Sequence, residues 1–366
     1  MAIYYPLTKI KEGEMRAWQE VEPRVEEVAM PIFEMLPDNK TYKPLNRVEN
    51  ALHLLRSSWK KVSREFMLDC TAISCDKKLP NGKSVLLEMA ERLHFNSYHV
   101  IHCYRFNQET AHEADLIEAV LRLKLTKIAI RFESDDIKLW QQSAEILESL
   151  LEKCGLSYDQ IIVILDFKKL PANTDECTRL CDIAYKNLNG MGVKEIVFLA
   201  TSMLDSAEIK PANKVIEVKR SDFALWCQLI TSLPKLRYGD YLVIQRFVDD
   251  DAVNAKETSK KGFYRSSSPK VRYPTGSCWL VIKGDPLKDG ENNQYPRLAR
   301  EIINHSQFRL NELTWGHEEL KDLASYRYQK AKNSEVIAID VNNHLNLCAD
   351  QVQAVVEKLR VQTTSL

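Results

Sequence analysis

Short apolar runs, each about the length of a β-strand, recur along the chain. They are continuous rather than alternating, which is typical of strands that are buried on both faces. Their spacing of 29 to 45 residues is the length of a βα unit. The runs cover residues 32–36, 66–70, 99–103, 128–132, 161–166, 196–201, 241–244 and 278–282.

Between these runs, apolar residues recur at the spacing of an α-helix. Residues 44–61, for example, carry Val48, Leu52 and Leu55 at intervals of four and three. Eight strands with intervening helices predict an α/β protein that forms a (β/α)8 TIM-like barrel. An open, doubly wound sheet has the same periodicity and stays open as the alternative. Helices are predicted at 11–28, 44–61, 84–93, 109–123, 137–154, 175–188, 221–233, 296–303 and 349–359.

The seventh unit of the predicted barrel is irregular, because residues 247–277 lack helical periodicity. Within it, residues 256–272 form a basic loop with six lysines and arginines and a single acid, Glu257. Such a loop is a candidate contact for phosphate groups or nucleic acid, or a solvated excursion. We expect the barrel with its N-terminal helix to cover 1–305, and a C-terminal extension, 306–366, to pack on the barrel rather than form a separate domain.

Composition and charge narrow the class of protein. The 366 residues include 51 basic and 51 acidic side chains and are 45% hydrophobic, which is ordinary for a globular protein and gives no general attraction to nucleic acid or membranes. The sequence has neither a membrane-spanning apolar stretch nor the apolar run of a signal peptide, so we expect a cytoplasmic protein without membrane contact. The nine cysteines are expected to be reduced core residues.

The candidate chemistry lies where the predicted strands end, because barrel enzymes work at the C-terminal ends of their strands. Three carboxylates at these ends are candidate ligands of a divalent metal, and His102 is a candidate general base oriented by Asp69 or Asp166. Arg131 and Lys283 would hold a phosphate or carboxylate group of a substrate. An internal salt bridge between Arg131 and Asp166 is the structural alternative. The strand-end residues are Glu34, Asp69, His102, Arg131, Asp166 and Lys283.

Several short motifs together resemble one protein family. Tyr4-Tyr5-Pro6-Leu7 precedes Met30-Pro31-Ile32-Phe33-Glu34, and Tyr238-Gly239-Asp240-Tyr241 and Asn342-Asn343-His344-Leu345 follow in order. This series resembles the beta protein family, which is named after a T-even bacteriophage protein. The resemblance covers nearly the whole chain. It implies an association with bacteriophages or with bacterial antiviral defence operons.

The resemblance also adds Asp240 and His344 to the candidate ligand-binding residues. If the C-terminal segment folds over the barrel mouth, His344 would join the strand-end carboxylates; if it packs elsewhere, this histidine is structural.

Two functions follow. In the first, the C-terminal face of the barrel recognises a macromolecular partner or a nucleotide-like ligand, with a protein from the same operon or a phage component as partner and nucleic acid as a further option through loop 256–272. In the second, the protein is a metal-dependent phosphoester or nucleic-acid hydrolase in which Asp69, His102 and Asp166 are catalytic. No cofactor is predicted by the sequence, and a divalent metal belongs only to the second function.

Overall fold

The computed structural model describes residues 2–39, 43–59, 64–106, 110–243, 268–286, 294–325 and 331–364. The chain divides into two compact units. The barrel unit comprises Met1–Ile10, Ala29–Thr201 and Asp222–Asp240. The sheet-helix unit comprises Lys11–Val28, Ser202–Ser221 and Tyr241–Leu366. The expected division into a barrel over 1–305 and an extension over 306–366 stays a prediction.

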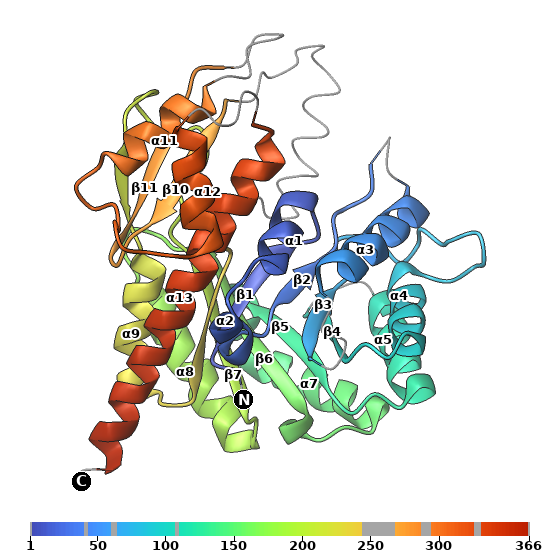
Figure 1. Cartoon of the computed structure of the whole chain (residues 1–366). Helices are drawn as coiled ribbons and strands as arrows, with labels where there is room; N and C mark the ends of the chain where they lie inside the picture. The colour runs from blue at the N-terminus through green and yellow to red at the C-terminus, as the bar shows by residue number, and fades with distance from the viewer. Residues whose placement is uncertain are drawn as a thin grey trace. The chain divides into compact units, whose positions relative to one another are not determined.

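The barrel unit confirms the predicted (β/α)8 fold. Its strands form a closed barrel in the order β1-β2-β3-β4-β5-β6-β7-β9, and neighbouring strands pair in parallel (Figure 1). The apolar runs from residue 32 to residue 201 supply strands β2 to β7, as predicted. The barrel strands are β1 (Tyr4–Lys9), β2 (Ile32–Glu34), β3 (Phe66–Asp69), β4 (Val100–Arg105), β5 (Ile128–Glu133), β6 (Ile161–Lys169), β7 (Glu195–Thr201) and β9 (Leu236–Asp240).

The two remaining barrel strands differ from the prediction. The barrel is closed by β1, which pairs with β2 on one side and with β9 on the other. The run at 278–282 is therefore wrong as the eighth barrel strand; it forms β11 (Cys278–Lys283) in a separate antiparallel sheet. The seventh predicted strand began at residue 241, whereas β9 ends at Asp240.

Closure requires a residue without a side chain in β9. Gly239 pairs with Tyr5 of β1, and a Cβ atom on Gly239 would lie 2.8 Å from the carbonyl oxygen of Tyr5 and 3.2 Å from that of Phe198. Because both neighbours are backbone atoms, no rotamer change relieves the contact. The glycine of the Tyr-Gly-Asp-Tyr motif thus permits the close approach of β1, β7 and β9.

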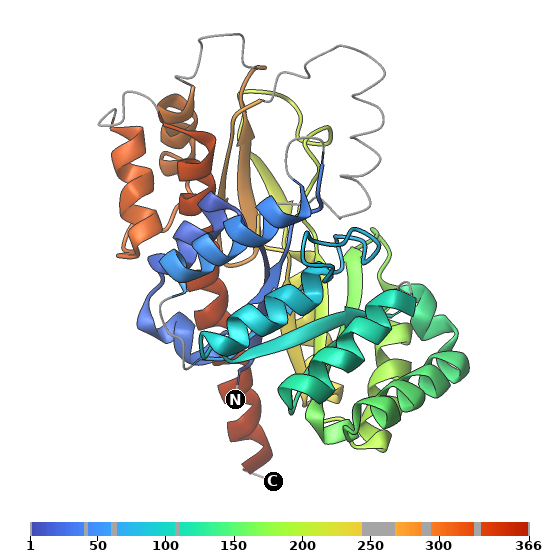
Figure 2. The ribbon, with the colours of Figure 1, turned by 90° about the vertical axis from the view of Figure 1, so that its right-hand side faces the viewer.

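Helices cover the outer side of the strands, as in other α/β barrels. Figure 2 shows the blue-to-green helices α3, α4, α5 and α7 following one another around the strands. The layer between the strands and the helices is filled by fully buried aliphatic and aromatic side chains, including Phe33, Phe66, Phe132 and Phe198. The helices are α3 (Pro44–Ser58), α4 (Val85–Phe95), α5 (Thr110–Leu123), α6 (Ser134–Lys138), α7 (Trp140–Cys154), α8 (Asp175–Met191) and α9 (Ser221–Ser232), with a 3-10 turn, η1 (Tyr158–Gln160).

The sheet-helix unit has its own sheet and core. Its strands are β8 (Ile216–Lys219), β10 (Lys270–Pro274) and β11, in the antiparallel order β10-β11-β8. Apolar side chains of β10 and β11 pack with α11 and α12 into one buried cluster that includes Leu280, Leu298 and Leu320. The helices are α1 (Glu12–Gln19), α2 (Pro23–Val28), α11 (Tyr295–Ile303), α12 (Trp315–Ala324) and α13 (Asn333–Thr364).

The long helix α13 links the other helices of this unit. The buried Asn342 side chain donates to the carbonyl oxygens of Ala17 and Glu20 at the end of α1, at 3.2 and 2.8 Å, and its Oδ1 accepts from the Gly316 N–H of α12 at 2.9 Å. The bonds to the Glu20 carbonyl and the Gly316 N–H satisfy backbone groups at the end of α1 and the start of α12. The helix begins well before the predicted residue 349, and the described residues contain no helix that is long and apolar enough to cross a membrane. Most of the predicted basic loop, residues 256–267, lies outside the described residues.

Candidate functional site

Four of the predicted strand-end residues meet inside the barrel. Glu34, Asp69, Arg131 and Asp166 come from β2, β3, β5 and β6, and each is at most 3% exposed. Residues that pair across parallel strands point to the same face, and Glu34 pairs directly with Asp69. The barrel closure therefore brings three carboxylates and a guanidinium together from segments that lie far apart in sequence.

Arg131 is at the centre of this cluster. Its Nη2 donates to Asp166 Oδ2 at 2.6 Å, and its Nη1 donates to Asp69 Oδ2 and, at 3.3 Å, to Glu34 Oε1. Charge-assisted bonds of this kind are stronger than neutral ones. The salt bridge that the sequence offered as a structural alternative, between Arg131 and Asp166, is present.

Two further cations complete the cluster, and the sequence analysis missed both. Arg105 at the end of β4 donates to Glu34 Oε1 at 2.6 Å and to Asp69 Oδ2 at 3.3 Å. Lys9 of β1 lies 3.9 Å from Glu34 Oε2. The cluster thus pairs three carboxylates with three cations. Arg105 was detectable, since it follows the apolar run at 99–103; Lys9 was not, because β1 was not predicted. We call these six residues the charge cluster: Lys9, Glu34, Asp69, Arg105, Arg131 and Asp166.

Electrostatics inside the cluster favour the ionised form of Asp69. Burial opposes the charge of Asp69, but the guanidiniums of Arg105 and Arg131 outweigh that effect and hold the pKa of Asp69 well below its usual value. The backbone N–H and the hydroxyl of Thr71 also donate to Asp69 Oδ1, at 2.9 and 2.5 Å. Asp69 therefore remains an anion held in a fixed orientation.

His102 lies outside the charge cluster. Its neighbour Cys103 pairs with Asp69, and burial together with the Asp69 charge raises the pKa of that thiol, so Cys103 faces the barrel interior. Side chains alternate along a strand, and His102 therefore points toward the helix layer. Burial lowers its pKa to about 4, and its Nδ1 has no hydrogen-bond partner among the described residues. The expected orientation of His102 by Asp69 or Asp166 is not found.

Asp240 also occupies the outer face of the barrel wall. Both of its carboxylate oxygens accept from the Tyr4 hydroxyl, at 3.1 and 3.2 Å. Tyr4 stacks on Tyr238, whose hydroxyl donates to Asp222 Oδ2 at 2.8 Å. Since Tyr238 and Asp240 lie two residues apart on β9, both side chains leave the same face. Asp240 thus belongs to a buried tyrosine–aspartate arrangement that joins β1 and β9.

The last two candidates belong to the sheet-helix unit. Lys283 ends β11, and its Nζ donates to the Ser206 carbonyl at 2.7 Å. Its expected place at a barrel strand end is wrong, because β11 is not a barrel strand. His344 is 1% exposed on α13, where it stacks on Trp279 with ring centroids 4.4 Å apart and its Nε2 lies 3.3 Å from Cys348 Sγ. Their roles in ligand binding stay predictions.

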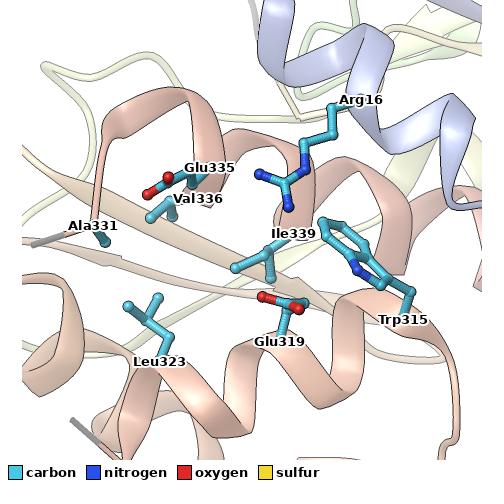
Figure 3. Close-up of a pocket in the computed structure, with 8 residues that line it drawn as sticks. All are labelled: Arg16, Trp315, Glu319, Leu323, Ala331, Glu335, Val336 and Ile339. Carbon is cyan, nitrogen blue, oxygen red and sulfur yellow. The ribbon is translucent and has the colours of Figure 1, made fainter. Parts of the chain in front are cut away.

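A small pocket between α1, α12 and α13 is lined by apolar and charged side chains (Figure 3). The Arg16 guanidinium lies 5.3 Å above the centroid of the Trp315 ring. This cation–π contact covers the indole face that a cationic ligand would use. The pocket is thus closed to a cation at this face of Trp315. Its lining is completed by Glu319, Leu323, Ala331, Glu335, Val336 and Ile339.

The charge cluster is a poor match for a divalent metal. Magnesium and calcium need several carboxylate or carbonyl oxygens that face a common point. Here the converging oxygens of Asp69, Asp166 and Glu34 accept hydrogen bonds from Arg131, which occupies that point with a positive charge. A cation would have to displace the guanidinium, so these residues do not fit the metal that the hydrolase hypothesis requires.

Comparison with known proteins identifies the family of this chain. A chitinase from Chromobacterium violaceum ATCC 12472 is 11% identical, with a TM-score of 0.31, over 93% of this chain and 99% of that chain. The reductase domain of an aureusimine biosynthetic cluster is 10% identical, with a TM-score of 0.20, over 96% and 91% of the respective chains. A search of curated protein sequences finds no match. The family model described as Beta protein matches residues 4–350, and the chain therefore belongs to the Beta protein family.

Proposed function

We propose that this chain is a recognition protein of phage or antiviral defence systems, whose C-terminal barrel face binds a macromolecular partner or a nucleotide-like ligand without turnover. The association with phages and defence rests on the family resemblance. The location rests on the general placement of barrel sites at the strand C-termini. The ligand-binding residues we propose there are Glu34 and Arg131, with Arg105 added from its contacts.

One observation carries the choice of binding over hydrolysis. The three strand-end carboxylates are already paired with guanidiniums, with Arg131 bonded to all three. A network whose charges are satisfied internally is rigid and presents fixed polar groups. Such groups suit selective binding, because their side chains are already ordered before the ligand binds.

Arg105 is the cation of the cluster best placed to meet a ligand. It ends β4 and is 8% exposed, against 2% for Arg131 and 3% for Lys9. A guanidinium at this position can hold a phosphate or a carboxylate through two parallel N–H bonds. The ligand class that fits is therefore an anionic group on a nucleotide or on a partner protein.

A thermal-unfolding titration tests the proposal. The purified chain is heated with Mg²⁺, Mn²⁺, Ca²⁺ or Zn²⁺, and separately with a panel of nucleotides. A ligand at about 100 times its Kd stabilises the folded state by about 2.7 kcal/mol. We expect no shift with the metals alone, and a nucleotide shift that Arg105→Gln abolishes but the exposed helix variant Arg179→Gln preserves. If no nucleotide shifts the midpoint, a protein partner captured by the wild type and lost with Arg105→Gln supports the proposal.

The hydrolase is the second candidate: its three carboxylates converge, but on Arg131 rather than on a free metal position. A stabilisation by one divalent metal that Asp166→Asn removes, together with cleavage of a phosphoester by the metal-loaded protein, would overturn the recognition proposal. His102 would not be the acid–base group in that case, since it faces the helix layer.

A further inference from the structure

A second cluster of reactive groups lies in the barrel unit, apart from the charge cluster. Cys75 belongs to the loop between β3 and α4, and His112 belongs to the first turn of α5, which follows β4. Both positions come after a barrel strand, so they lie at the C-terminal end of the barrel. Cys75 Sγ and His112 Nδ1 are 3.0 Å apart.

A carboxylate and an ammonium group accompany this pair. Asp115 follows His112 by three residues on α5 and therefore shares its helix face. It is 8% exposed, its Oδ2 lies 3.9 Å from Lys78 Nζ, and no hydrogen bond to that oxygen is found among the described residues. The loop thus meets α5 at two points, once through the thiol and once through Lys78.

The surroundings favour a charged pair over a neutral one. A thiolate gains from an adjacent imidazolium, and Cys75 Sγ lies within hydrogen-bond distance of His112 Nδ1. The Asp115 carboxylate in turn favours the imidazolium.

Burial restricts what the pair can meet. Cys75 is 2% exposed and His112 is 1% exposed, yet Asp76 and Lys77, next in the loop, are exposed. The thiol therefore lies directly beneath a surface loop. Only a small reagent fits such a position, which excludes a large substrate.

We propose that Cys75 and His112 form a reactive thiolate–imidazolium pair that is oxidised by a small, uncharged peroxide. The thiolate sulfur attacks one peroxide oxygen, an S–O bond forms and the O–O bond breaks. Sulfur loses two electrons and becomes a sulfenic acid, while the leaving hydroxide takes the proton of His112 and departs as water. The site is independent of the proposed function, because it uses no member of the charge cluster.

Trapping of the sulfenic acid tests the proposal. The intact protein is treated with hydrogen peroxide at pH 7, samples are quenched with catalase over time and unfolded in urea with dimedone, and labelled peptides are quantified by mass spectrometry. We expect Cys75 to be labelled at least tenfold faster than Cys227, which is partly exposed. A thiol with a pKa of about 8.5 is about 3% ionised at pH 7, so His112→Gln should slow labelling by up to about 30-fold. His94→Gln, an exposed histidine on α4, should leave the rate unchanged.

Equal labelling rates for Cys75 and Cys227, or an unchanged Cys75 rate in a folded His112→Gln variant, would overturn the proposal. If that variant does not fold, the wild type still decides. The rate of Cys75 alkylation by iodoacetamide should be nearly flat from pH 6 to 8, whereas a tenfold rise per pH unit would show an ordinary thiol and refute the pair.

Discussion

Arg131 Nη2 donates to Asp166 Oδ2 across 2.6 Å, and neither side chain is more than 2% exposed. The two residues belong to neighbouring strands, β5 and β6, so the bond links two strands of the barrel wall. A buried ion pair is costly to break, because the remaining charge has no solvent to stabilise it.

Asp166→Asn should therefore destabilise the fold strongly. The amide keeps the shape of the carboxylate but leaves Arg131 with one anion fewer, and the expected loss is about 3 kcal/mol in the free energy of unfolding. Urea unfolding at pH 7 measures it. Asp182→Asn, which removes an exposed i,i+4 pair with Lys186 on α8, should change stability by less than about 0.5 kcal/mol. Equal effects of the two variants would mean that the cluster does not stabilise the barrel.

Asp69 should make stability depend on acid pH. Despite burial, Arg105 and Arg131 hold its pKa below the usual value, so the folded state releases the proton more readily than the unfolded state. The resulting stabilisation is complete above the unfolded pKa of about 4 and is lost as pH falls through the lower folded pKa. Urea unfolding at pH 6, 4.5 and 3.5 should show a smaller decline for Asp69→Asn than for the wild type. Parallel curves would contradict this assignment.

Asp340 should produce the opposite dependence. Burial raises its pKa to about 7, and Arg272, whose Nη1 lies 3.4 Å away, only partly offsets this. The folded state therefore binds the proton more tightly than the unfolded state, so the contribution of Asp340 is present below about pH 4 and is lost as pH rises toward 7. Asp340→Asn should lose less stability than the wild type between pH 5 and pH 8, by an amount on the order of 1 kcal/mol or more. A wild-type pH profile in the variant would be the contrary result.

Gly239→Ala should disturb barrel closure. The added Cβ meets the Tyr5 carbonyl oxygen at 2.8 Å, and overpacking of this kind costs about 1 to 3 kcal/mol. Gly190→Ala on α8 is the matched control, since no atom lies within 4 Å of the new Cβ and alanine favours a helix. Thermal unfolding should show a lower midpoint for the first variant and an unchanged or higher one for the second. If Gly239→Ala left the unfolding midpoint unchanged, β1 and β9 could separate without loss of stability.

Much of the barrel could be predicted because strands buried on both faces need continuous apolar runs. Strand β1 was not predicted because it lacks such a run: Tyr4–Lys9 contains Pro6, Thr8 and Lys9. Its polar groups are compensated only by partners such as Glu34 in the folded barrel. The apolar run of β11 was assigned to the barrel because β11 is the almost fully buried central strand of its own sheet. Sequence alone does not distinguish such a strand from a barrel strand.

The candidate site was predictable in part. Charged residues that interrupt apolar runs pointed correctly to Glu34, Asp69, Arg131 and Asp166 as a group. What lies between the carboxylates could be found only from the distances in the structure, because either a metal or a guanidinium can occupy the centre of three carboxylates. His102 lies apart from this group because a single step along a strand reverses the face of a side chain. Cys75 lies in a loop and His112 in the first turn of α5, and no local pattern connects them.

The place of β1 in the barrel also has a consequence for synthesis on the ribosome. Strand β1 can pair with β2 early, but its other partner, β9, is the last barrel strand to be made. At ordinary translation rates of about 5 to 20 residues per second, on the order of ten seconds or more pass between the two. During that interval one edge of the first strand has no neighbour, so the nascent barrel is exposed to aggregation until the final strand emerges and closes it.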